Sequence, residues 1–203
     1  MPMKINLGKT ALKIDMSFAA AVTLTLILDE SGVCACALFC CMVHEAGHII
    51  CLWIAGERPS SVVLSFYGVK LERGFSCVCG KTEEILIYAA GPAANALLAA
   101  AFFPFGEKAR AAAVISLFVG LFNMLPCRPL DGGNILFFAL CRFTEEDRAE
   151  KICFWISAAV LVPMAAAGLA LMLKSGNITL IAASCYLAAV GFTERGGIKN
   201  VKI

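Results

Sequence analysis

The stretch CCMVHEAGHIICL, residues 40–52, holds both histidines of the chain, with a glutamate between them. His44 and His48 are four residues apart, so on a helix they share one face, about 6 Å apart along the axis. Two imidazoles placed in this way can bind one zinc ion, at about 2.0–2.1 Å from each nitrogen. Glu45 is rotated away from both, where its carboxylate can reach a water at the metal. The spacing is that of the H-E-x-x-H zinc pattern.

The residues around this pattern are apolar, and that setting favours a metal site. An ionisable side chain at membrane depth costs about 2.5–3.5 kcal/mol or more, so such groups are usually kept for a function. In a soluble helix, histidine and glutamate are ordinary surface residues, but a membrane span has no solvated face to receive them. We therefore predict a metal site at His44 and His48.

A third ligand has to come from elsewhere, because a catalytic zinc takes three protein ligands and a water. Cys40, His44 and His48 would form a row about 12 Å long on one helix, which is too long for one ion. Asp131 is the only carboxylate in the stretch 123–135, where two prolines and two adjacent glycines interrupt the helical pattern. Asp131 is the predicted third ligand, and Cys127 and Cys41 are the alternatives.

The composition indicates a polytopic membrane protein. Of the 203 residues, 60% are hydrophobic and 16% are charged, whereas soluble domains average about 45–50% and about 25%. The net charge of +2 is too small to suggest a nucleic-acid partner. We expect an all-α transmembrane fold of about six helices, forming a single membrane-embedded domain over residues 1–203, with the fourth helix broken. The apolar segments cover 15–28, 33–55, 84–104, 109–126, 152–173 and 177–193.

The basic residues predict the orientation of these segments. If the N-terminus is cytoplasmic, only Lys108, Arg110 and Lys174 of the 17 lysines and arginines fall on the outer side. Cytoplasmic loops carry an excess of basic residues in membrane proteins. Both termini are therefore expected in the cytoplasm, in a multi-pass protein of the cell membrane.

The connection 60–81 alternates apolar and polar residues in parts, with turns at Tyr67-Gly68 and Arg73-Gly74. It predicts a small β-hairpin or sheet at the membrane surface, between the second and third helices. Its edge could pair with an extended peptide, or it could simply cover the bundle. Cys77 and Cys79 are read either as a redox or metal pair or as half-buried strand residues in a reducing compartment. Most of the 11 cysteines lie in apolar runs, as small hydrophobic residues.

Three motifs in order, HEAGH, AAGPAANALLA and NMLPCRPLDGG, resemble the site-2 protease family of intramembrane zinc metalloproteases, peptidase family M50. The likeness spans about residues 10–195 and, within the family, is closest to the stage IV sporulation protein FB type. It implies one catalytic zinc with His44, His48 and Asp131 as its ligands. It also implies Glu45 as the catalytic base, and Asn123, Asn95 and the 60–81 strands as elements that hold an unwound substrate.

The resemblance also implies an activity. The enzyme would hydrolyse a peptide bond in or near the transmembrane segment of a membrane-tethered protein, in regulated intramembrane proteolysis, with its active site nearer the cytoplasmic side of a bacterial cell membrane. The lipid bilayer and an inhibitory or gating membrane protein are the other expected partners. No PDZ-like insertion or CBS domain is expected in this chain.

Two further polar residues each have two interpretations, and a third has one. Asn123 could donate a hydrogen bond to the oxyanion or to the substrate backbone, or it could cap the end of its helix. Asn95 could face the active site, or it could belong to a stripe of small residues that allows close helix packing. Arg128 is expected to extend its side chain to the lipid headgroups.

Two other classes of function compete with a protease. A zinc-binding membrane protein without hydrolysis, such as a metal transporter or sensor, would be expected to place its ligands along a path through several spans, and Glu45 would have no role in it. A purely structural helical bundle leaves the cost of HEAGH in the membrane without a reason.

Overall fold

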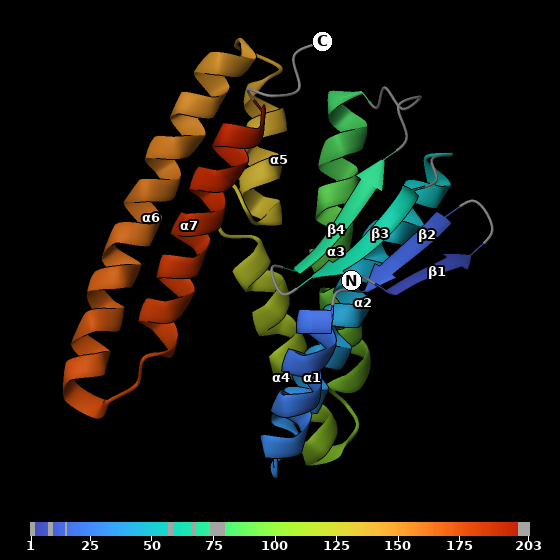
Figure 1. The fold of residues 1–203 in the computed structure, drawn as a ribbon, viewed down its shortest axis with the longest axis vertical. Coiled ribbons are helices and arrows are strands. Elements are labelled where there is room, and N and C mark those ends of the chain that lie inside the picture. The colour runs from blue at the N-terminus through green and yellow to red at the C-terminus, as the bar shows by residue number, and fades with distance from the viewer. Residues whose placement is uncertain are drawn as a thin grey trace. The chain divides into compact units, whose positions relative to one another are not determined.

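The computed structural model describes residues 3–7, 10–14, 16–56, 59–65, 68–73 and 80–198, and the side chains of 20, 22–24, 26–56 and 80–191. Among the described residues, two strands, two helices, two further strands and five helices follow one another along the chain, with the labels of Figure 1. The strands are β1 (Met3–Leu7), β2 (Thr10–Ile14), β3 (Pro59–Ser65) and β4 (Gly68–Arg73). The helices of the described residues are α1 (Met16–Leu28), α2 (Val33–Ile54), α3 (Lys81–Phe102), α4 (Gly106–Asn123), α5 (Asp131–Leu140), α6 (Glu146–Ser175) and α7 (Thr179–Ile198).

The six apolar segments expected from the sequence correspond to α1, α2, α3, α4, α6 and α7. The described part of the chain has one further helix, the short α5, which begins inside the stretch 123–135 where the fourth segment was expected to break. Three helices, α2, α3 and α6, are long and apolar enough to cross a membrane, by length and composition. Their interiors lack charged residues apart from Glu45, as expected of membrane spans.

The four described strands form one sheet in the order β1-β2-β3-β4. β3 and β4 occupy the connection between α2 and α3 and pair antiparallel, with Val62 opposite Leu71 and a register irregularity between Pro59 and Ser61. β2 pairs with β3 in parallel, and β1 pairs with β2 antiparallel. The two N-terminal strands were not expected from the sequence. Cys77 and Cys79 lie outside the described residues.

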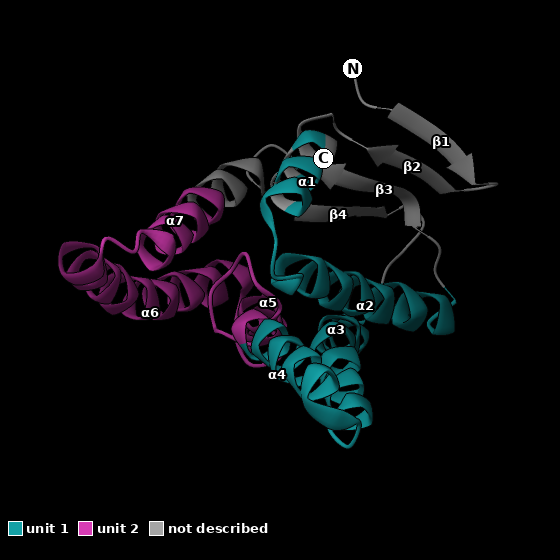
Figure 2. Cartoon of the chain, turned by 90° about the horizontal axis from the view of Figure 1, so that it is seen from below, with its two compact units in different colours: residues 1–121 teal, residues 122–203 magenta. Residues whose placement is uncertain are grey.

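The chain divides into two compact units, residues 1–121 and 122–203, coloured separately in Figure 2. In the first unit, α2 and α3 pack against each other. Small residues let these helices approach, since a Cβ built on Gly47 would lie 2.6 Å from the carbonyl oxygen of Ala90. Close backbone approach of this kind supplies packing between helices in a lipid environment, where a hydrophobic driving force is absent.

In the second unit, α6 packs against α7, and a core of Cys127, Leu130 and Leu187 lies beside them. Gly168 of α6 faces Ile181 so closely that a Cβ would lie 2.6 Å from the Ile181 nitrogen.

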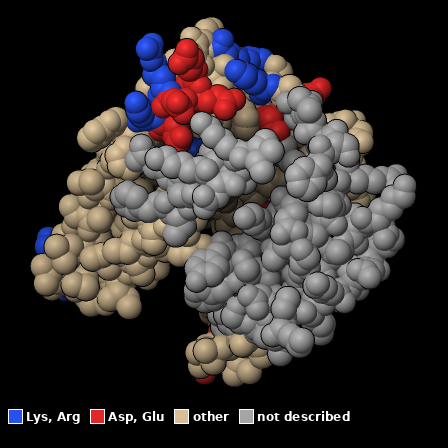
Figure 3. Space-filling model, turned by 45° about the horizontal axis from the view of Figure 1, so that its top comes forward, with Lys and Arg blue, Asp and Glu red and all other residues tan. Residues whose placement is uncertain are grey.

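On the visible face of the molecule, charged side chains gather mainly at the top of the view in Figure 3. The charges of α6 itself lie in its first two turns and at Lys174, and the stretch 152–173 between them is uncharged.

Candidate metal centre

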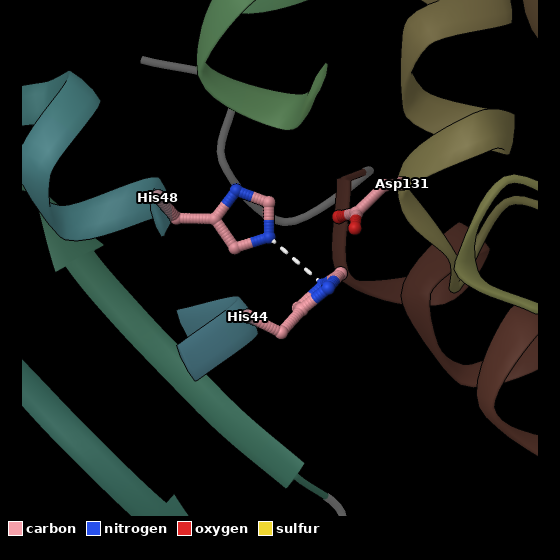
Figure 4. A group of neighbouring side chains, drawn as sticks. All are labelled: His44, His48 and Asp131. Atoms are coloured by element: carbon pink, nitrogen blue, oxygen red, sulfur yellow. Dashed lines mark hydrogen bonds between the residues drawn. The ribbon is translucent and has the colours of Figure 1, made fainter. Parts of the chain in front are cut away.

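The two histidines lie on the face of α2 that packs inside the first unit. Cys40, His44, His48 and Leu52 follow one another at intervals of four residues, and all are buried. The exposed fractions of His44 and His48 are 3% and 6%. A buried imidazole requires hydrogen-bond partners or a metal. The structure therefore places the predicted histidines side by side on the buried face of α2 (Figure 4).

Each imidazole is held on its Nδ1 side by an acceptor from α3. His48 Nδ1 donates to the backbone carbonyl of Ile87, at 2.7 Å. His44 Nδ1 lies 3.2 Å from the side-chain amide of Asn95, whose Oδ1 accepts from it in the orientation that satisfies every neighbour of that amide. Because a neutral imidazole has one N–H, neutral rings in this arrangement carry their proton on Nδ1, and Nε2 is the unprotonated nitrogen of each.

The two Nε2 atoms face each other at 3.2 Å, along the dashed line in Figure 4. With nitrogen–zinc distances of about 2.0–2.1 Å, this separation corresponds to an angle of about 100° at the metal, close to tetrahedral. Two lone pairs facing each other at this distance repel unless a positive charge lies between them. The histidine pair therefore fits a zinc ion in its donor type, its spacing and its second hydrogen bonds.

Gly91 of α3 lies directly against both rings. A Cβ built at Gly91 would overlap Nε2 of His48 and come within 2.7 Å of Nε2 of His44. The space beside the Nε2 atoms of both imidazoles is therefore open only because residue 91 is glycine. This role of Gly91 was not predicted from the sequence. A signal was present, since Ile87, Gly91 and Asn95 follow the same interval of four residues as the buried face of α2.

Glu45 and Asn123 were the other residues predicted to take part in chemistry. Glu45 lies on α2 directly after His44 and is half-buried. Asn123 is the last residue of α4 and is also half-buried. Its place at the helix end is the one that the capping alternative requires, and it is also where the backbone becomes irregular. Both of its roles stay predictions.

Asp131 belongs to the second unit, where it is the first residue of α5. An acidic side chain in the first turn of a helix is stabilised in its charged form by the helix dipole, and a carboxylate must be charged to bind a metal. Gly132 and Gly133 follow, and a Cβ on either would overlap the backbone of Met124 or Cys127. These glycines let the stretch 124–130 fold back on the first turn of α5.

The irregular stretch before Asp131 is held by side chains of its own unit. Ser157 of α6 accepts a hydrogen bond from the Arg128 amide at 3.2 Å and donates to the Cys153 carbonyl at 2.8 Å. The Arg128 guanidinium donates to Asn134 Oδ1 at 2.6 Å and lies 4.3 Å from the centre of the Phe137 ring. The Arg128 side chain thus connects the stretch 124–130 to α5, and its expected extension to the lipid headgroups stays a prediction.

Two family models match stretches of the chain that contain the residues described above. The family model described as Peptidase M50B-like matches residues 17–128, and the one described as Peptidase family M50 matches residues 107–164. The first range covers more than half of the chain and contains HEAGH, and the second contains Asp131. No curated protein matches the chain.

A solved structure supports the fold. The site-2 protease from Methanocaldococcus jannaschii has a TM-score of 0.67 and is 20% identical to this chain. The alignment covers 96% of this chain and 95% of that chain. At this level of identity the likeness shows a shared fold, and the chemistry has to be argued from the residues.

Proposed function

This chain belongs to the Peptidase M50B-like family, and on that basis we propose that it is an intramembrane zinc metalloprotease. Its substrate is a membrane-tethered protein, cut in or near the transmembrane segment. The observation that carries the proposal is the pair of buried imidazoles on α2, with Nε2 atoms 3.2 Å apart. Within the family, we propose that the chain is of the stage IV sporulation protein FB type.

We propose His44, His48 and Asp131 as the ligands of one zinc ion. Together they supply two imidazole nitrogens and a carboxylate oxygen, a set of three protein ligands that leaves the fourth position for water or substrate. Zinc bound there lowers the pKa of a water towards neutrality and polarises the scissile carbonyl. Asp131 is the ligand whose charge offsets part of the charge of the ion.

Glu45 is the proposed general base. It accepts a proton from the attacking water and delivers it to the leaving amine. Glu45 lies on the same helix as the two histidines, one position after His44, so the geometry of α2 sets the place of its backbone relative to them. Asn123 is proposed to donate a hydrogen bond to the oxyanion or to the substrate backbone.

A helical substrate must be unwound before its peptide bond can be attacked, because its amides are tied up in hydrogen bonds. β4 stands at one end of the strand order and pairs with β3. We propose that an extended substrate segment adds to the free edge of this sheet. The membrane topology with both termini cytoplasmic, and a gating or inhibitory membrane partner, belong to the same proposal.

The function is tested by assaying cleavage of tethered substrates by the purified protein in detergent, together with zinc content. Glu45→Gln is expected to retain zinc and to lose about 10²–10⁴-fold in cleavage rate. Asp131→Asn is expected to weaken both zinc binding and cleavage. Glu107→Gln, which removes an exposed carboxylate from α4, is the matched control and should behave as wild type.

Two outcomes would contradict parts of the proposal. Full zinc binding by Asp131→Asn would point to a cysteine ligand, with Cys127 and Cys41 the first to test. A wild-type protein that binds zinc and cleaves none of the substrates would favour the non-hydrolytic alternative, a metal transporter or sensor.

A further inference from the structure

Asn95 of α3 is fully buried, with an exposed fraction of 0%, at a point where three helices of the first unit meet. Its Nδ2 donates to the Cys40 carbonyl of α2 at 3.0 Å. Its Oδ1 accepts from His44 Nδ1 and from the Gly120 amide of α4, each at 3.2 Å. Its backbone carbonyl accepts from Ser116 Oγ at 3.0 Å. The amide group is therefore fully engaged within the protein.

We propose that Asn95 is a positioning residue for the metal: its Oδ1 fixes His44 as the Nδ1–H tautomer and aims the Nε2 lone pair at the ion. This inference rests on the proposed zinc site and deepens it. It differs from the role in substrate holding that the family resemblance implied, because both polar atoms of the amide already have partners in α2 and α4.

The physical argument begins with the ring of His44. A histidine that binds a metal through one nitrogen usually donates its other N–H to an oxygen, which sets the tautomer and the ring orientation. Asn95 supplies that oxygen and is itself prevented from turning, because its Nδ2 is bonded to Cys40 and its Oδ1 also holds Gly120. A side-chain amide held at both ends has one orientation available.

The second histidine shows the same arrangement with a backbone group. His48 donates to the Ile87 carbonyl at 2.7 Å, and Ile87 precedes Asn95 by two helical turns on the same buried face of α3. Thus α3 orients both imidazoles of α2. The backbone carbonyl of Ile87 cannot be removed by substitution, whereas the Asn95 amide can, so a variant at Asn95 releases one metal ligand and leaves the other in place.

The test compares zinc affinities of purified variants by competition with a chromogenic chelator. Asn95→Leu keeps the approximate size of the side chain but removes the acceptor, and zinc is expected to bind about 10–100-fold more weakly. Asn95→Asp keeps an oxygen towards His44 and is expected to remain within a few-fold of wild type, about threefold at most. Ser116→Ala is the matched control, because it removes a hydrogen bond to the same residue's backbone and leaves the amide intact.

A second measurement uses the wild-type protein and does not depend on how any variant folds. With ring-¹⁵N-labelled histidine and bound zinc, nuclear magnetic resonance should show His44 protonated at Nδ1 and bound through Nε2. Binding of His44 through Nδ1, or an Asn95→Leu protein with wild-type zinc affinity, would overturn the proposal. So would loss of affinity in Ser116→Ala equal to that in Asn95→Leu.

These readouts separate the inference from the proposed function. A wild-type protein that binds zinc, shows the expected tautomer and cleaves no substrate would refute the protease and leave the positioning role standing. A wild-type protein that cleaves substrate, with an Asn95→Leu variant that keeps both zinc affinity and tautomer, would support the protease and refute the role of Asn95.

Discussion

Single hydrogen bonds orient the two imidazoles of the candidate metal centre. An imidazole has two nitrogens, and the way each one is used decides whether the ring is a structural donor or a metal ligand. The Nδ1–H of His44 and that of His48 each donate to a different oxygen on α3, and the two Nε2 atoms face each other at 3.2 Å. Burying two histidines among apolar helices is costly unless their polar atoms are satisfied, and two Nε2 atoms that face each other suit a cation between them.

Gly91 gives a prediction at the same scale. Replacing it by alanine places a methyl group on the metal side of both rings, and the rings cannot move aside without losing their hydrogen bonds to Ile87 and Asn95. We expect Gly91→Ala to bind zinc at least about tenfold more weakly and to lose about 1–3 kcal/mol of stability from overpacking. Zinc titration and thermal unfolding measure the two effects.

The matched control for this substitution is Gly80→Ala, immediately before α3. A Cβ at Gly80 has as its nearest neighbour the Glu83 carboxylate, at 3.8 Å, which is an ordinary contact. This variant should keep its zinc. Equal zinc binding by Gly91→Ala and wild type would mean that the ion does not lie between the two Nε2 atoms.

The pattern HEAGH was sufficient to predict His44 and His48 as a pair, because residues four apart on one helix are neighbours whatever the rest of the fold does. The contact between Asn95 and His44 joins residues 51 positions apart. It depends on the register between α2 and α3, which the sequence does not express locally. The choice between an active-site role and small-residue packing was therefore open, and the structure places Asn95 against the ring of His44.

At the scale of the elements, hydropathy located the helices well and their ends less well. The segment expected to begin at residue 152 begins at Glu146 as α6, because acidic residues are favourable in the first turn of a helix although they are not apolar. α5 was expected only as a break. Two glycines in its first turn lower its intrinsic helix propensity, and contact with the backbone of Met124 and Cys127 requires them there.

The N-terminal strands show a different limit. β1 and β2 come from a stretch whose lysines and short apolar runs give no clear period, and β2 pairs in parallel with β3, about 50 residues later in the chain. A strand in such a sheet is stabilised by its partners across the ladder more than by its own residues. Sequence patterns near residue 10 therefore carried no signal of this pairing.

Asp29 gives a prediction for the start of α2. Its carboxylate accepts hydrogen bonds from the Ser31 hydroxyl at 2.6 Å and from the amides of Cys34 and Ala35 in the first turn of the helix, at 2.7 and 3.2 Å. The bond from Ser31 is the main cause that holds the pKa of Asp29 below its ordinary value. A pKa lowered by folding means that the charged carboxylate stabilises the folded state.

This contribution is complete at pH values above the unfolded pKa, about 3.9, and is lost as the pH falls through the lower folded pKa. We expect Asp29→Ala to lower the thermal midpoint at pH 7, with a difference from wild type that disappears in acid. Glu30→Ala, which removes an exposed neighbouring carboxylate, should change little. A difference between Asp29→Ala and wild type that grows below about pH 4 would contradict this role.

At the scale of the whole molecule, the composition alone indicated a membrane protein, and α2, α3 and α6 have the length and hydropathy that this requires. The motifs also fall in different parts of the chain. HEAGH lies in the first compact unit, and Asp131 lies in the second. The sequence predicted ligands from distant segments, because two histidines on one helix cannot complete the coordination of a catalytic zinc. This ligand set stays a prediction.

The zinc ion proposed to bind His44, His48 and Asp131 would link distant segments of the chain, so its binding should stabilise the folded chain. A ligand that binds only the folded state adds about 2.7 kcal/mol when its free concentration is about 100 times the dissociation constant. For a chain of this size the gain corresponds to a rise of about 5–10 °C in the thermal midpoint. Unfolding in detergent, with zinc and with a chelator, measures it.

The variants identify the source of this gain. Glu45→Gln should keep the full rise with zinc, because Glu45 is the proposed base and not a ligand. Asp131→Asn should lose most of the rise, since two imidazoles from α2 alone hold the ion more weakly and join no second segment. A rise of the same size in Asp131→Asn and wild type would show that the metal is bound within the first unit only. The carboxylate at the start of α5 would then have no part in coordination.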